Sequence, residues 1–139
     1  MRFTLIAALL SCAAVSTAHI IGISGPTKYS PGTNSKYPLK FTTSDGPITN
    51  EDFSVVIGLG NSATGSEALG TFIHNFDLEN SGHGSTADGS FTLQVPLPSS
   101  AFNNGPGDYV IIAAVTNADG AQWNVNLKFF TTTVTVTGV

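Results

Sequence analysis

Asp108-Tyr-Val-Ile-Ile-Ala-Ala-Val115 is the most apolar stretch beyond the amino-terminal segment, and it decides the fold. Gly105-Pro106-Gly107 precedes it, and Asp119-Gly120 separates it from a second run rich in Val, Thr and Phe at residues 122–137. β-Branched and aromatic runs bounded by turn-forming residues are typical of strands. An uninterrupted apolar run is typical of a strand that is buried on both faces. We therefore expect residues 108–117 to form a central strand.

The rest of the chain alternates between strand-like runs and turns in the same way. Gly, Pro, Asn or paired Thr interrupts nearly every window, so no helical periodicity develops. Asp-Gly pairs at 45–46, 88–89 and 119–120 are typical of tight turns. In residues 90–97 apolar and polar side chains alternate, which predicts one buried face. The sequence therefore predicts an all-β fold, an immunoglobulin-like antiparallel β-sandwich of about seven strands. The expected strands are 19–24, 36–43, 52–59, 68–78, 90–97, 108–117 and 122–137.

The end of the last expected strand carries no charge. Residues 129–139 read Phe-Phe-Thr-Thr-Thr-Val-Thr-Val-Thr-Gly-Val. A free sheet edge of this composition would pair readily with other chains and aggregate. We therefore expect this strand to be paired on both sides or covered.

The first 18 residues have the organisation of a secretory signal peptide. Arg2 precedes the apolar run Phe3–Leu10, and Ser16-Thr17-Ala18 offers the small residues that a signal peptidase recognises. We expect residues 1–18 to be removed and residues 19–139 to form one secreted β-sandwich domain.

Removal of this segment changes the cysteine count and the charge. Cys12 is the only cysteine, so the remaining domain would be cysteine-free and stabilised by packing instead of disulfides. A bacterial lipoprotein box that ends in an acylated Cys12 is the alternative.

The domain that remains after removal of residues 1–18 would carry four lysines and nine carboxylates, a net charge of −5. This leaves no basic surface for nucleic acid. No apolar run reaches the roughly 18 residues needed to span a bilayer, so we expect no membrane insertion.

His19 is the sharpest chemical feature of the sequence. As the first residue after cleavage it would offer both its amine and its imidazole to one metal ion, as in copper histidine braces. A second imidazole would have to come from His74 or His83, whose spacing is no metal signature. We expect no cofactor and keep a copper site at His19 and His74 as the alternative. In the other interpretation His19 merely begins the first strand.

Catalytic motifs do not stand out. Gly58-Leu-Gly-Asn-Ser-Ala63 formally fits a dinucleotide fingerprint, but Gly65 and Gly70 prevent the helix that would hold a pyrophosphate. The sequence contains no nucleophile elbow and no phosphate-binding loop, and its carboxylates are scattered over turns. We therefore expect that the protein is not an enzyme.

Three residues are candidates for binding a protein partner. Trp123 follows the Asp119-Gly120 turn, where an amphipathic ring can anchor a partner. Asp119 lies in the turn itself, and His83 lies in the polar, Gly-rich loop Glu79–Gly89, which is long for a hairpin. A core position for Trp123 and a plain connection at 79–89 are the alternatives. We expect the protein to be a monomer.

The order of these features resembles the fungal necrosis-inducing secreted proteins of plant pathogens, which are elicitors of the hypersensitive response. The resemblance covers nearly the whole secreted chain. It rests on the export signal followed by Ile20-Ile21-Gly22-Ile23-Ser24, Ser30-Pro31-Gly32, Phe53–Gly60, Leu69–Phe72 and Pro106–Tyr109.

The resemblance implies a virulence effector without catalytic activity. Such a protein triggers plant cell death or defence, outside or within plant cells, by binding host proteins such as immune receptor-associated kinases. It implies no catalytic or ligand-binding residue. A cell-wall carbohydrate-binding module is a further alternative, although the sequence lacks the aromatic row expected of a flat sugar platform.

Overall fold

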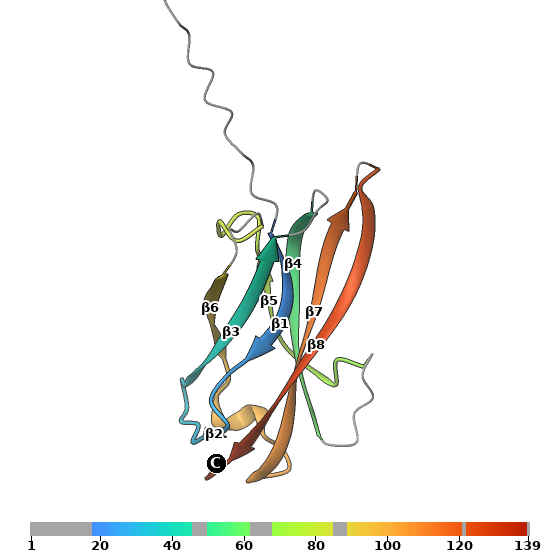
Figure 1. Ribbon diagram of the computed structural model, residues 1–139. Coiled ribbons are helices and arrows are strands. Elements are labelled where there is room, and N and C mark those ends of the chain that lie inside the picture. The colour runs from blue at the N-terminus through green and yellow to red at the C-terminus, as the bar shows by residue number, and fades with distance from the viewer. Residues whose placement is uncertain (1–17, 46–49, 62–67, 85–88, 121, 139) are drawn as a thin grey trace, which may run out of the picture.

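The protein is a two-layer β-sandwich (Figure 1). The computed structural model describes residues 18–45, 50–61, 68–84, 89–120 and 122–138. The elements in these ranges are β1 (Ala18–Ser24), β2 (Lys28–Tyr29), β3 (Lys36–Asp45), β4 (Asn50–Asn61), β5 (Thr71–Asp77), β6 (Gly89–Pro96), the 3-10 helix η1 (Ser99–Ala101), β7 (Gly107–Asp119) and β8 (Asn124–Val136).

The sheet order is that of an immunoglobulin-like sandwich. One sheet has the order β1-β3-β6 and the other β2-β8-β7-β4-β5. Lettered in chain order as A, A′, B, C, C′, E, F and G, the sheets read A-B-E and A′-G-F-C-C′, an immunoglobulin-like arrangement. All pairings are antiparallel except that of β2 with β8. The predicted all-β sandwich is confirmed, and the two-residue β2 adds to the seven expected strands.

β7 is a central strand of the larger sheet, as its sequence predicts. It pairs with β4 on one side and with β8 on the other. Ile111, Ala113 and Val115 are buried on one face, and Ile112 and Ala114 are buried on the opposite face. Burial on both faces explains why its apolar run is uninterrupted.

The two ends of the sandwich are called upper and lower as they lie in Figure 1. β1, β4 and β8 begin at the upper end, and β3 and β7 begin at the lower end. Aromatic residues pack at the lower end, where the rings of Tyr29 and Tyr37 lie 5.3 Å apart and those of Phe102 and Tyr109 lie 4.9 Å apart. Each tyrosine hydroxyl donates to a backbone carbonyl 2.7 to 2.9 Å away. Burial raises the pKa of Tyr37 to about 12, so its hydroxyl remains a donor.

β8 has a neighbour on one side only over most of its length. β7 pairs with it from Asn124 to Val136, whereas β2 reaches only Thr135 and Val136. From Asn124 to Val134 no described strand lies on the other side, and this part of β8 forms the margin of the molecule in Figure 1. The expectation that the last strand is paired on both sides or covered is wrong there. The chain before β2 belongs to the other sheet, so β2 extends no further along β8.

Candidate functional site

The β7–β8 hairpin forms one side of the upper end. Asp119 ends β7 and is half-buried. Gly120 follows with φ +74°, and the N–H of Trp123 donates to the carbonyl of Gly120 at 3.1 Å. The Trp123 side chain is 51% exposed, so the alternative of a core tryptophan does not hold.

Trp123 also has a strained backbone. Its φ of +53° is the only positive value at a non-glycine position in the described ranges. A side chain in this region costs about 1–2 kcal/mol relative to an ordinary conformation. Strain of this kind at an exposed residue motivates a functional hypothesis for that residue.

The loop after β5 forms the opposite side of the upper end. The carboxylate of Asp77 accepts hydrogen bonds from the backbone N–H and the side chain of Asn80, which lower the pKa of Asp77. The ring of His83 stacks on Phe91 with a centroid distance of 4.2 Å and an interplanar angle of 8°. His83 is therefore held against β6. Residues 85–88 of the expected recognition loop lie outside the described residues.

Asp52 connects this loop with β1. Its side chain is 2% exposed, and Oδ2 accepts the N–H of Ile20 at 2.7 Å. Its own backbone N–H donates to the carbonyl of Gly84, next to His83, at 2.9 Å. Burial raises the pKa of Asp52, although the hydrogen bond from Ile20 acts in the opposite direction.

Sequence reasoning missed Asp52 as a member of this end. The β4 alternation gives no such signal, because Asp52 is out of phase with the core residues Val55 and Ile57 and faces inward only through the register irregularity between Asp52 and Ser54. Asn117 of β7 lies opposite Asp52 in the register and is fully buried. Within the described part of the chain, neither Oδ1 nor Nδ2 of Asn117 has a hydrogen-bond partner. A buried amide without partners costs about 1–3 kcal/mol.

The structure does not bring His19 and His74 together. The Nδ1 atom of His19 lies 3.5 Å from the side-chain amide of Asn50, the first residue of β4. His74 pairs with Ile57, which lies seven residues further along the same strand. At roughly 3.3 Å per residue the two sites are about 23 Å apart along β4. Among the residues that the structure describes, no group of three or more His, Cys, Asp or Glu side chains is arranged to hold a metal ion.

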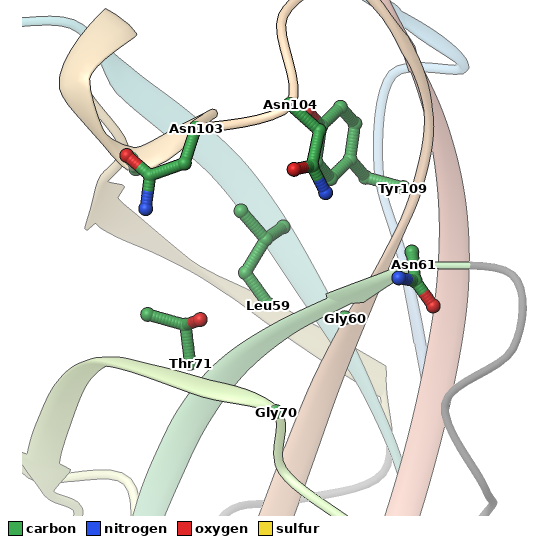
Figure 2. Close-up of a pocket in the computed structure, with 9 residues that line it drawn as sticks. Leu59, Gly60, Asn61, Gly70, Thr71, Asn103, Asn104 and Tyr109 are labelled. Atoms are coloured by element: carbon green, nitrogen blue, oxygen red, sulfur yellow. The ribbon is translucent and has the colours of Figure 1, made fainter.

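A polar cavity of about 320 Å³ lies at the lower end of the sandwich (Figure 2). In Figure 2 Leu59 lies at its centre, with Asn103 and Asn104 on one side and Thr71 on the other. The remaining lining residues are Gly60, Asn61, Gly70, Ala101 and Tyr109. This lining holds hydrogen-bonding side chains but no charged group. It suits an uncharged polar ligand better than an ion.

The sequence model of the Nis1 family matches residues 16–135, which include β1 to β7 and nearly all of β8. The chain belongs to the Nis1 family. Both ends of the sandwich fall within the match, so this family assignment covers the Trp123 hairpin and the lower cavity alike. No curated protein matches this Nis1-family chain in a direct sequence search. In the described ranges, no helix has the length and apolar character needed to cross a membrane.

Proposed function

We propose that this Nis1-family protein is a secreted fungal effector that induces plant cell death or defence responses. It acts without catalysis, by binding a host protein of the class of immune receptor-associated kinases. The resemblance to necrosis-inducing secreted proteins and the signal peptide predicted from residues 1–18 support this proposal.

The observation that carries the proposal is the exposed, strained Trp123 at the upper end. Tryptophan is enriched among the residues that dominate protein–protein binding energy, because its ring buries a large area with few rotatable bonds. Asp119 lies in the same hairpin, and the His83 ring is fixed across the upper end by Phe91. Trp123 thus presents an apolar anchor with the polar Asp119 in the same hairpin, a combination that suits a protein surface.

Leaf infiltration tests the biological part of the proposal. The protein recovered from the medium of a secreting host is infiltrated at micromolar concentration, and necrosis and defence-gene induction are scored. We expect both responses. Their absence with protein shown to be folded by circular dichroism would overturn the effector proposal.

A binding measurement tests the assigned surface. The protein is immobilised and used to capture kinases from leaf extract, and the captured kinase is then titrated with purified variants. We expect Trp123→Ala to weaken binding about 30-fold, since truncating a central anchor costs about 2 kcal/mol or more. Phe72→Ala is the matched control, because Phe72 is 63% exposed on β5, away from the upper hairpin. Equal effects of the two substitutions would contradict the assignment of Trp123.

The polar cavity favours a second candidate function, a cell-wall carbohydrate-binding module. Asn103, Asn104 and Thr71 could satisfy sugar hydroxyls, although the ring of Tyr109 is only 6% exposed and offers no stacking face. Retention on insoluble chitin or glucan tests this candidate. Asn103→Ala should lower retention if the cavity holds the sugar, whereas full passage of the wild-type protein through both matrices would rule it out.

A further inference from the structure

The free side of β8 carries a regular set of backbone hydrogen-bonding groups. The N–H groups of Thr135 and Thr137 donate toward β2, to the carbonyls of Thr27 and Tyr29, each at 2.9 Å. Alternate residues of a strand direct their backbone groups to the same side. The odd-numbered residues from Val125 to Thr133 therefore direct their N–H and C=O groups to the side where no strand is described.

The same residues carry an apolar face. Val125 is 68% exposed and Leu127 is 55% exposed, and Phe129 is half-buried. They lie on the outer face of the sheet, because the alternating even-numbered residues Val134 and Val136 are buried in the core. An unpaired edge and an exposed apolar row thus coincide on one strand, the combination that favours pairing with another strand.

At the β8 edge the net charge of the protein opposes the approach of a second copy least. The protein has a formal net charge of −4, so two copies repel each other over most surfaces. β8 contains no carboxylate, and Lys128 is its one charged residue. Antiparallel pairing of β8 with itself about Leu127 places Lys128 opposite Asn126 of the second copy. It also places Val125 opposite Phe129 of the second copy, so apolar side chains meet across the pair.

We propose that two copies of the protein associate through their β8 edges, antiparallel and centred on Leu127. The two five-stranded sheets then become one continuous sheet across a two-fold axis. This inference goes beyond the proposed function, because its partner is another copy and not a host protein. It also departs from the monomer expected from the sequence. One edge per copy is a small interface, so the association is weak.

Sedimentation velocity tests the dimer with the secreted protein over concentrations from about 1 µM to about 1 mM. The mass should rise from that of one chain toward twice that value. Leu127→Lys should weaken association at least about tenfold, because it brings ammonium groups together at the axis. Phe72→Lys changes an exposed aromatic residue on the opposite edge strand, β5, and should leave association unchanged. A wild-type protein that stays monomeric throughout, or equal weakening by both variants, overturns the proposal.

Cross-linking tests the register independently of the lysine variants. A Leu127→Cys variant places its thiols opposite each other at the axis, where paired strands hold Cα atoms about 5.5 Å apart, within disulfide reach. Mild oxidation should yield a disulfide-linked dimer, and Phe72→Cys should remain monomeric under the same conditions. Folding of each variant is checked by circular dichroism. Leu127→Cys that is folded but stays uncross-linked overturns the proposed pairing.

Discussion

The two halves of β8 lie in different surroundings. In the lower half Thr135 and Val136 pair with β2, and Val134 and Val136 enter the core. In the upper half only β7 lies alongside, and Val125 and Leu127 are exposed.

The residues near the two halves of β8 also differ in whether their polar groups and backbone are in favourable states. Near the lower half the buried tyrosine hydroxyls all have acceptors. At the upper end Asn117 is buried without partners in the described part of the chain, Asp52 is buried with a raised pKa, and Trp123 has a strained backbone. The comparison teaches that the lower half contributes stability, whereas the upper half retains features that cost stability. Backbone strain and other destabilising features of this kind are concentrated at the sites where proteins bind partners.

The largest expected effect comes from truncating the lower core. Phe102 is 3% exposed and packs on Tyr109, so Phe102→Ala should lower the free energy of unfolding by about 3–5 kcal/mol. Val125→Ala in the upper half is the matched comparison and should change the free energy of unfolding by less than about 0.5 kcal/mol. Urea denaturation measures both. Similar losses for the two variants would remove the distinction between the halves.

Replacing the unpartnered amide should stabilise the upper end. Asn117→Leu has a similar volume and removes a buried polar group, so the free energy of unfolding should rise by about 1–3 kcal/mol. Asn126→Leu is the control, because Asn126 lies opposite Asn117 on β8 but is exposed. If Asn117→Leu destabilises the protein in the same urea titration, the amide has a structural role that its contacts do not reveal.

Relieving the backbone strain at Trp123 should have a smaller effect. Glycine adopts positive φ without a steric penalty, so Trp123→Gly should gain about 1 kcal/mol over Trp123→Ala. Thermal unfolding of the two variants measures the difference, since both lack the ring and only the backbone conformation separates them. A less stable glycine variant would show that the hairpin does not carry this strain.

The smallest expected effect is a change in pH dependence. Burial raises the folded-state pKa of Asp52 above its ordinary value of 3.8. Its contribution to stability is therefore fully present below pH 3.8 and is lost as the pH rises through the folded-state pKa. Asp52→Asn should remove this part of the pH dependence in urea titrations between about pH 3 and pH 7. A pH profile that the substitution leaves unchanged would contradict the role of burial at Asp52.

The strands were predictable where local pattern decides them. The run from Asp108 to Val115 indicates a central strand, and the alternation in residues 90–97 indicates the buried face of β6. β2 was not predictable, because two residues carry no periodicity. The free edge of β8 was not predictable either, because it depends on where the distant β2 begins.

The site was predictable only in part. Trp123, Asp119 and His83 were identified as surface candidates from their turns, and the structure places all three at the upper end. The relation of Asp52 to Ile20 and to Asn117 depends on contacts between strands far apart in sequence. Copper coordination by His19 and His74 was compatible with the sequence, but their positions along β4 separate them.

β1 begins at Ala18, which is fully buried and pairs with Asp45 at the upper end. An affinity tag or fluorophore joined to the amino terminus that signal-peptide removal would leave at His19 would therefore emerge at the same end of the sandwich as Trp123 and interfere with the measurements proposed for that residue. Gly138 is exposed at the lower end, after β8 has ended. Labels for imaging or immobilisation belong at the lower end, because a label there leaves the upper end accessible.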